Sequence, residues 1–539
     1  MNPCVSDVIA SALTRHIDTF FGLMGNGNAW LCHALEESGH GIVAVRHEVA
    51  AVAAADAFHR SSGKLAAATT TYGPGYTNTI TALAEAAMAR TPLVYVVGDS
   101  PTTGKRPWDV DQTAIAAAVG APTFTVSPDT AGTVTVDAIA HALAERLPVV
   151  LAVPYDVGAV PATEAGMVIP GLPASPSLPE LTAADADTIA GLLLDARHPL
   201  ILAGRGAASA ATGVRALAAQ LAADAATSAP ARGLFAGGSG YRDLGVCGGF
   251  ATEFAAEQIR EADVVLVIGA GLNQFTMAFG EAFSPDVSVI QIDLLGSATH
   301  PRVDHYFQAD SALAVKEILA RLGDVSRTGV EKQAVPTPAR PEGDALAPDG
   351  RLDPRSLMVR LNRALPKDKL VASDGGHFIG WANMYLDLPA ADSINLLGTA
   401  FQSIGLGFPT GVGVATAAGT RTTVLVTGDG GGLMGFADAE SFVRTAHRGV
   451  VVVFNDAAYG AEIHQYATKG LRDEPMLIPE VDFAGLFRAL GAKAEVIREL
   501  DDLAGFEEWM RTDARGTYVL DCRVSPQVVA PYMQEIAGI

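Results

Sequence analysis

Residues 423–462 read TVLVTGDGGGLMGFADAESFVRTAHRGVVVVFNDAAYGAE, with two runs of apolar, mostly β-branched residues on either side of a longer mixed stretch. The first run predicts a strand that ends at Thr427, and Gly428–Gly432 predict a tight turn after it. The mixed stretch has helical periodicity, and the second run predicts a strand that ends at Phe454. Strand, glycine turn, helix and strand in this order are typical of a parallel sheet covered by helices.

Acidic side chains follow both of these strands. Asp429 lies in the glycine turn, and Asn455 and Asp456 follow the second strand. Because ligands of open parallel sheets bind beyond the carboxyl ends of the strands, these side chains are expected at a ligand-binding edge. Carboxylates bind Mg²⁺ or Ca²⁺, and glycines let backbone N–H groups approach an anion. The pattern indicates a diphosphate held with a divalent metal ion; the alternative is a tight strand-to-helix connection and an ordinary turn.

The same alternation of apolar runs and Ala-rich helical stretches covers the whole chain of 539 residues. Two segments interrupt it and are predicted linkers: residues 157–181 are rich in Pro, and residues 324–350 mix Pro, Gly and charge. Strands that are apolar on both faces predict parallel sheets with helices on both sides. The expected fold class is α/β, with three doubly wound parallel-sheet domains at 1–156, 182–323 and 351–539.

Composition argues against several classes of protein. The chain has 37 Lys and Arg against 59 Asp and Glu, a net charge of −22, which disfavours a nucleic-acid partner. The uncharged stretch 393–420 is rich in Gly and polar residues and predicts buried loops, so no membrane segment is expected. No export signal is visible at the N-terminus. Four cysteines without a CxxC pair fit the reduced cytoplasm.

Residues 423–462 resemble the diphosphate-binding domain of the thiamine-diphosphate-dependent enzymes, the group of acetolactate synthase, pyruvate decarboxylase and benzaldehyde lyase. In that group GDG is followed by a stretch that ends in Asn-Asn or Asn-Asp, and the metal is Mg²⁺, with Ca²⁺ or Mn²⁺ in its place. The resemblance implies that the metal ligands here are the side chains of Asp429 and Asp456 and the backbone carbonyl of Ala458. Many members have Asn where this chain has Asp456, so its site carries an additional negative charge.

Two segments of the first domain resemble the pyrimidine-binding domain of the same family, VRHEVAAVAAADAFHRSSGK at 45–64 and TTTYGPGYTNTI at 69–80. The resemblance implies that Glu48 hydrogen-bonds the aminopyrimidine ring and exchanges a proton with the cofactor. The alternative is that Glu48 only complements the dipole at the start of a helix. The turn expected beside the cofactor consists of Gly73, Pro74, Gly75 and Asn78.

Two segments of the third domain complete the expected cofactor site. SDGGHF at 373–378 resembles the segment that meets the diphosphate, although a surface position for His377 is the alternative. In GTAFQSIGLGFPTG at 398–411, the carbonyl of Gln402 would accept from the cofactor's amino group, and Ile404 would hold its two rings in a bent conformation. Ordinary core packing is the alternative for Ile404. The expected cofactor-binding residues are Glu48, Gly73, Pro74, Gly75, Asn78, Gly376, His377, Phe378, Gln402, Ile404, Gly428, Asp429, Gly430, Gly431, Asp456, Ala458, Tyr459, Gly460 and Ala461.

Candidate residues on the substrate side leave the reaction open. Asn26 stands where related decarboxylases have Asp or Ser, and its amide can orient a carbonyl. Gln112 agrees with the carboligases, whereas Glu462 lies where pyruvate decarboxylase has a proton-relay Glu. The expected catalytic residues are therefore Glu48, Gln112, Glu462 and Asn26. The alternatives are packing behind the site for Asn26 and a solvated loop for Glu462.

The central block resembles the family's central domain, which binds FAD in some members. Gly271 stands where flavin-binding relatives commonly have Arg, which removes a cationic partner for the flavin, so we expect no functional flavin. Family active sites lie between two subunits, so the resemblance implies at least a homodimer, with a tetramer as the expected assembly.

The sequence thus predicts a cytoplasmic enzyme that depends on thiamine diphosphate and Mg²⁺. Its small-molecule substrate is a 2-oxo acid or a related 2-hydroxy carbonyl compound. The first expectation is an acetolactate-synthase-like carboligase, a transferase. The alternatives are a 2-oxo acid decarboxylase and a 2-hydroxyacyl or benzaldehyde-type lyase, and the least favoured is a homologue without catalytic activity.

Overall fold

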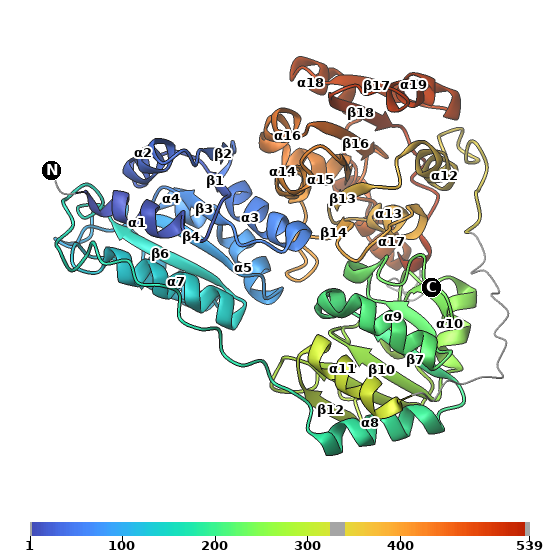
Figure 1. Cartoon of the computed structure of the whole chain (residues 1–539). Helices are drawn as coiled ribbons and strands as arrows, with labels where there is room; N and C mark the ends of the chain where they lie inside the picture. Colours follow the sequence, from blue (N-terminus) through green and yellow to red (C-terminus); the bar gives the residue numbers. More distant parts are fainter. Residues whose placement is uncertain (1–2, 324–339, 534–539) are drawn as a thin grey trace.

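The structure is a computed structural model that describes residues 3–323 and 340–533. Figure 1 shows three lobes, with the N-terminal part in blue, the central part in green and the C-terminal part in orange to red. Each lobe contains one six-stranded sheet. Every strand pairing between neighbours is parallel, and helices cover the sheets. The predicted class of three doubly wound α/β domains is confirmed.

The N-terminal sheet has the strand order β2-β1-β3-β4-β6-β5. Its strands are β1 (Phe20–Gly22), β2 (Ile42–Ala44), β3 (Ala67–Thr70), β4 (Leu93–Asp99), β5 (Thr123–Thr125) and β6 (Pro148–Pro154). Its helices are α1 (Val5–Leu13), α2 (Ala29–Glu37), α3 (Glu48–Ser62), α4 (Pro74–Thr77), α5 (Ile80–Met88), α6 (Gln112–Ala118) and α7 (Ala131–Glu145). The chain leaves β1 and β3 towards opposite edges of the sheet, so a crevice is expected beyond the carboxyl ends of these two strands.

The central sheet has the order β12-β11-β10-β7-β8-β9. Its strands are β7 (Pro199–Ala203), β8 (Asp224–Thr227), β9 (Arg242–Val246), β10 (Val264–Ile268), β11 (Ser288–Asp293) and β12 (His305–Gln308). Its helices are α8 (Ala183–Asp195), α9 (Ala211–Gln220), α10 (Glu253–Arg260) and α11 (Ser311–Leu322). An extended segment connects this lobe to the N-terminal lobe (Figure 1).

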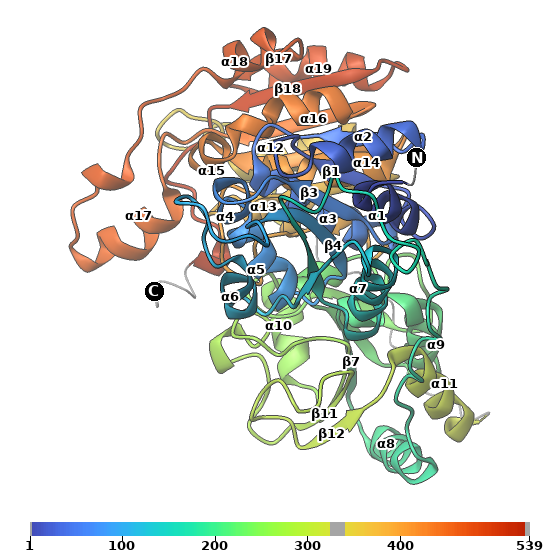
Figure 2. The same ribbon diagram turned by 90° about the vertical axis from the view of Figure 1, so that its left-hand side faces the viewer.

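The C-terminal sheet has the order β14-β13-β15-β16-β18-β17. Its strands are β13 (Lys369–Ser373), β14 (Ile394–Asn395), β15 (Thr422–Gly428), β16 (Arg448–Phe454), β17 (Lys493–Ile497) and β18 (Gly516–Cys522). Its helices are α12 (Pro354–Ala364), α13 (Ile379–Tyr385), α14 (Gly407–Ala418), α15 (Asp429–Met434), α16 (Ala439–Thr445), α17 (Gly460–Tyr466), α18 (Phe483–Ala489) and α19 (Ala504–Met510). Figure 2 shows α17 extending away from this sheet.

Three local expectations differ from the structure. Residues 393–420, predicted as buried loops, contain β14 and the helix α14. The predicted turn Gly428–Gly432 is wrong, because α15 begins at Asp429 and contains the three following glycines. The first part of the predicted linker 157–181 packs on the N-terminal lobe, where Val157 and Ala162 are buried among apolar side chains of α1 and α7. Most of the second predicted linker, 324–350, lies outside the described residues.

The N-terminal and C-terminal lobes pack together through α3 and α14, and their apolar residues form a common core. Asn395 extends this contact, since its side-chain amide donates to the carbonyl oxygen of Ala57 at 3.0 Å. The backbone N–H groups of Arg46 and His47 donate to the buried carboxylate of Asp438 at 2.7 and 3.2 Å. The start of α3, and with it Glu48, is therefore fixed against the C-terminal lobe.

Close approach of α3 and α14 depends on Gly413. A Cβ atom at this position would lie 2.2 Å from the carbonyl oxygen of Ala54. We expect Gly413→Ala to lower the free energy of unfolding by about 1–3 kcal/mol, because the helices must move apart. Gly191 in α8 is the matched control, since a Cβ atom there meets nothing within 4 Å. Gly191→Ala should raise stability by about 0.5–1 kcal/mol, and thermal melting of both variants checks the opposite signs.

Two other properties of the described residues bear on the predicted cellular setting. In the part of the chain that the structure describes, no helix has the length and apolar character needed to cross a bilayer. The thiols of Cys32, Cys247 and Cys522 are buried and that of Cys4 is half-buried, and all four are free. Burial raises the pKa of Cys32 to about 11, which makes this thiol inert at neutral pH.

Candidate active site

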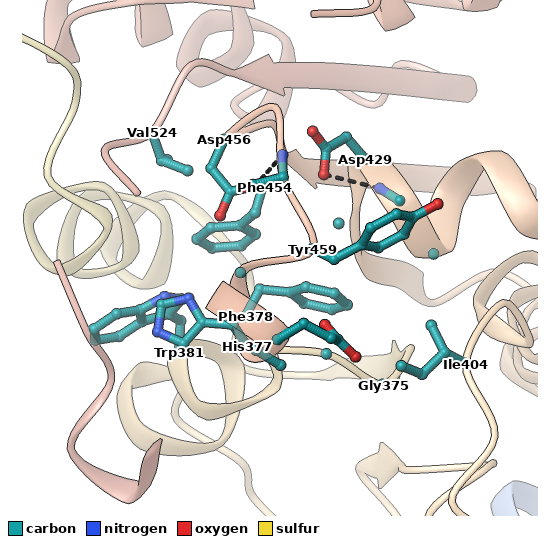
Figure 3. Close-up of a pocket in the computed structure, with 18 of the residues that line it drawn as sticks. Gly375, His377, Phe378, Trp381, Ile404, Asp429, Phe454, Asp456, Tyr459 and Val524 are labelled. Atoms are coloured by element: carbon teal, nitrogen blue, oxygen red, sulfur yellow. Dashed lines mark hydrogen bonds between the residues drawn. The ribbon is translucent and has the colours of Figure 1, made fainter. Parts of the chain in front are cut away.

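A pocket lies at the carboxyl ends of β13, β15, β16 and β18 in the C-terminal lobe. Its volume is about 520 Å³, open solvent at its mouth included. Gly428 pairs with Phe454 in the sheet, so the chain leaves β15 and β16 at the same level. This register brings Asp429 and Asp456 to one wall of the pocket, as the sequence predicted (Figure 3).

Backbone N–H groups fix the two carboxylates. Asp429 accepts from the N–H of Gly430 and, through its other oxygen, from the N–H of Ala457, both at 2.8 Å. Asp456 accepts from the N–H of Ala458 at 3.2 Å. Ala457 has a φ of +62°, a strained conformation for a residue with a side chain. This backbone conformation directs the N–H groups of Ala457 and Ala458 towards the two carboxylates.

The acidic pair fits a divalent cation. Burial raises the pKa of Asp429, and burial and the charge of Asp429 raise the pKa of Asp456. In the described part of the chain neither carboxylate has an ion-pair partner, and the guanidinium of Arg351 instead donates to the carbonyl oxygen of Asn455 at 3.0 Å. Asp429 is buried and Asp456 is half-buried. Two such carboxylates side by side without a cation are unfavourable, and a bound Mg²⁺ would offset their charge.

Protein side chains alone do not complete a metal site at this position. Within residues 3–323 and 340–533 no group of three or more His, Cys, Asp and Glu side chains could hold a metal ion. Mg²⁺ prefers six oxygen ligands and usually takes several of them from water or from a phosphate of the substrate or cofactor. A diphosphate in the pocket would supply the missing oxygens, together with the carbonyl of Ala458.

Glycines keep the pocket open beside the acids. A Cβ atom on Gly430 would lie 2.6 Å from the ring of Tyr459, and one on Gly428 would lie 2.8 Å from the ring of Phe378. A Cβ atom on Gly431 would lie 2.8 Å from a carboxylate oxygen of Asp374. Glycine backbone therefore forms this part of the wall, and the rings of Tyr459 and Phe378 pack directly against it.

His377 forms one end of the pocket, beside Trp381 (Figure 3). Its Nε2 accepts from the N–H of Ala530 at 2.8 Å, so the neutral ring carries its proton on Nδ1. Burial, reinforced by the neighbouring ring of His464, lowers the pKa of His377 to about 3. His377 can therefore donate a hydrogen bond to a phosphate oxygen as a neutral group, but not as a cation.

Asp374 is a site residue that the sequence analysis did not select. Its carboxylate is 1% exposed and accepts from the N–H groups of Gly375 and Gly405 at 2.8 and 3.0 Å. Burial raises its pKa to about 6. These bonds fix the loop that carries Ile404, which lines the pocket opposite His377 (Figure 3). The signal that could have revealed it is an acid soon after the short apolar run at 370–372.

The expected pyrimidine-side residues gather on the N-terminal lobe. The side-chain amide of Asn78 donates to Glu48 at 3.0 Å, and a Cβ atom on Gly75 would lie 3.5 Å from the other Glu48 oxygen. Gln112 is buried and holds the turn: its Oε1 accepts from the N–H of Gly73, and its Nε2 donates to the carbonyl of Gly98. Both polar ends of this side chain are therefore engaged with the backbone, which favours a positioning role.

The chain does not bring its two groups of site residues into one pocket. All residues that line the pocket around Asp429 lie between 354 and 525, and Glu462 is among them. Glu48, Gln112 and Asn26 lie on the N-terminal lobe outside it. Gln402 is exposed, has a φ of +59° and donates through Nε2 to the carbonyl of Thr399. Ile404 is 40% exposed, although it borders the pocket.

Several known proteins are similar to this chain over nearly its whole length. A probable 2-ketoarginine decarboxylase of Pseudomonas aeruginosa is 29% identical, with 90% of this chain and 88% of that protein aligned. An acetolactate synthase large subunit of Parasynechococcus marenigrum is 28% identical, with 90% and 81% aligned. A thiamine diphosphate-dependent 4-hydroxybenzoylformate decarboxylase of Rhodococcus jostii has the same fold, with a TM-score of 0.80, 20% identity and 97% and 99% of the two chains covered.

Three sequence models describe the domains of one enzyme family, and all three match this chain in order. The N-terminal TPP binding domain of the thiamine pyrophosphate enzymes matches residues 4–119, the central domain matches 186–318, and the C-terminal TPP binding domain matches 374–522. These segments contain the pocket glycines Gly428, Gly430 and Gly431, the acidic pair and Glu48. The chain therefore belongs to the thiamine pyrophosphate enzymes, that is, the enzymes that use thiamine diphosphate.

Proposed function

We propose that this enzyme binds thiamine diphosphate together with Mg²⁺ and decarboxylates a 2-oxo acid. The observation that carries the proposal is the position of Glu462 in the same pocket as Asp429 and Asp456. A carboxyl group there can deliver a proton to the carbon from which CO₂ has left, and the product is then an aldehyde. Decarboxylases among the similar proteins support this assignment.

The residues of this chain have separate tasks in the proposed reaction. Thiamine diphosphate, when bound, supplies an electron sink for the bond that breaks beside the substrate carbonyl. Asp429, Asp456 and the carbonyl of Ala458 would hold Mg²⁺, and the Nδ1–H of His377 would donate to the diphosphate. Glu48 would exchange a proton with the aminopyrimidine ring, and Ile404 would pack against the cofactor.

A complete site requires a second subunit in this proposal. Glu48 lies outside the pocket of its own chain, and Ile404, which borders the pocket, is 40% exposed. Exposed apolar side chains continue from Ile404 to Phe401 and Met434 on the same lobe, and a second copy would cover them. We propose at least a homodimer in which Glu48 of one copy faces Asp429 of the other.

Carboligation, as in acetolactate synthase, is the second candidate, because a 28% identical relative carries that name. Both reactions begin with loss of CO₂ from a 2-oxo acid, and they differ in whether a proton or a second carbonyl compound reacts next. In the sequence, Gln112 agrees with the carboligases. In the structure the amide of Gln112 is occupied by Gly73 and Gly98, so it is not free to bind an acceptor.

The test is incubation of the purified enzyme with thiamine diphosphate, Mg²⁺ and a panel of pyruvate, benzoylformate and 2-ketoarginine, with CO₂ and organic products identified by NMR. Free aldehyde supports the decarboxylase, whereas acetolactate or an acyloin assigns the carboligase. Glu462→Gln is expected to slow aldehyde release and to increase acyloin formation when an aldehyde is added. No CO₂ from any acid, with cofactor bound, would overturn the proposed function.

A further inference from the structure

A stack of aromatic and charged side chains lies beside the N-terminal group of site residues. The guanidinium carbon of Arg106 is 4.1 Å from the ring centre of Tyr72 and 4.7 Å from that of Tyr155. Two guanidinium N–H groups of Arg106 donate to the carboxylate of Asp109 at 2.8 and 3.0 Å. The Asp109 side chain is 2% exposed and that of Arg106 is 18% exposed. The cation is therefore neutralised and held in place, with one of its faces against tyrosine.

Backbone packing fixes one edge of the Tyr72 ring. A Cβ atom on Gly27 would lie 2.7 Å from the ring, and one on Gly98 would lie 3.0 Å from it. Tyr155 contacts the ring edge-on, with centroids 5.7 Å apart. Glycine at 27 and 98 thus allows the ring to lie directly against the backbone. The direction of the Tyr72 hydroxyl is set by this packing rather than by solvent.

The hydroxyl of Tyr72 points to Asn26, the residue expected to face the substrate. Its oxygen accepts a hydrogen bond from the side-chain amide of Asn26 at 3.1 Å. In the described part of the chain no acceptor is assigned to the Tyr72 O–H, so this proton remains available for a ligand. Asn26 follows β1 and Tyr72 follows β3, the two strands between which the order of the sheet reverses.

The segment that follows Tyr72 contacts Glu48, the acid expected to exchange a proton with the cofactor. The chain continues from Tyr72 through Gly73 into α4, and Gly75 lies against the carboxylate of Glu48. Gln112 at the start of α6 holds Gly73, and α4 and α6 lie on the same side of the lobe in Figure 2. The Tyr72 hydroxyl and Glu48 therefore belong to one edge of the sheet, at which the proposed function places the substrate.

We propose that the Tyr72 hydroxyl donates a hydrogen bond to an oxygen of the 2-oxo acid head group, and that Arg106 is the positioning residue that aims it. The proposal rests on the proposed function. An O–H and an amide N–H are neutral donors, so they recognise a carboxylate or carbonyl oxygen without an ion pair. An ion pair to the carboxylate would stabilise the substrate more than the transition state in which that charge leaves as CO₂.

The experiment compares the holoenzyme with Tyr72→Phe and Tyr155→Phe variants. Tyr72→Phe keeps the ring, with its contacts to Arg106 and the two glycines, and removes only the hydroxyl. We expect kcat/KM for the best 2-oxo acid of the panel to fall about 10- to 100-fold, since a substrate-facing donor is lost. The dissociation constant of thiamine diphosphate, its C2 proton exchange in D₂O and the melting temperature should remain unchanged. Tyr155→Phe, in the same stack, should leave all four quantities unchanged.

Two further measurements separate the possible outcomes. Asn26→Ala combined with Tyr72→Phe should cost less than the sum of the single losses, because both act through one hydrogen-bonded pair. Arg106→Met should raise KM and lower kcat for the same acid while C2 exchange persists. A kcat/KM of Tyr72→Phe within twofold of the wild type would overturn the assignment. Wild-type enzyme that releases no CO₂ from any 2-oxo acid would mean that the proposed function itself is wrong, and the assignment of Tyr72 would fail with it. Turnover by the wild type together with an unaffected Tyr72→Phe variant would overturn the assignment of Tyr72 alone.

Discussion

Glu48→Gln is expected to lower kcat by about 100- to 10,000-fold, the range that loss of a positioned acid–base group typically causes. Gln has nearly the same shape as Glu and can keep a hydrogen bond to Asn78, but it cannot exchange a proton. The variant should bind thiamine diphosphate and Mg²⁺, because Glu48 lies outside the pocket of Asp429 and Asp456. The exchange rate of the thiazolium C2 proton in D₂O, measured by NMR after acid quench, reports the step directly.

Two variants control this experiment. Glu37→Gln changes an exposed carboxylate at the end of α2 and should leave C2 exchange and kcat unchanged. Asn78→Ala leaves the Glu48 carboxylate in place but removes its neighbour at 3.0 Å, so a loss of about tenfold is expected. C2 exchange of Glu48→Gln at the wild-type rate, with cofactor bound, would contradict the role assigned to Glu48.

The position of the acidic pair could be predicted because local patterns determine it. Apolar runs give the strands, and parallel pairing places the residues after each strand at one edge, so Asp429 and Asp456 were found without tertiary information. The GDGGG turn was predicted wrongly for a physical reason. Glycine has a low helix propensity, which predicts a turn, but helix α15 contains all three glycines. At Gly430 and Gly431 the neighbouring Tyr459 and Asp374 leave no room for a side chain.

The parts of the site that the sequence did not reveal depend on contacts between distant segments. His377 obtains its tautomer from Ala530, which is 153 residues away, and no pattern near either residue encodes that bond. Arg106 meets Tyr72 and Tyr155 only because the loops after β3, β4 and β6 converge at one edge of the sheet. Chemistry of this kind becomes visible only when the packing is known.

Asp456→Ala is expected to abolish Mg²⁺-dependent retention of thiamine diphosphate. The side chain supplies one of two carboxylates beside the diphosphate pocket, and the chain has no third acidic ligand within the described residues. Loss of a direct ligand should weaken cofactor binding by more than the 10- to 100-fold typical of outer partners, that is, by at least about 100-fold. Desalting of the holoenzyme in the presence of Mg²⁺, followed by assay of bound cofactor, measures the effect. Asp473→Ala, on an exposed loop, should retain the cofactor fully.

Asp456→Asn separates the charge of this residue from its role as an oxygen ligand. The amide oxygen can still bind Mg²⁺, so cofactor retention should persist, but the repulsion between the two neighbouring carboxylates is gone. In the absence of metal, Asp456→Asn should therefore melt at a higher temperature than the wild type. Addition of Mg²⁺ and thiamine diphosphate should then stabilise the variant less than it stabilises the wild type. Equal melting temperatures of the metal-free wild type and Asp456→Asn would show that repulsion within the acidic pair does not destabilise the fold. Retention of thiamine diphosphate by Asp456→Ala would show that Asp456 is not a metal ligand.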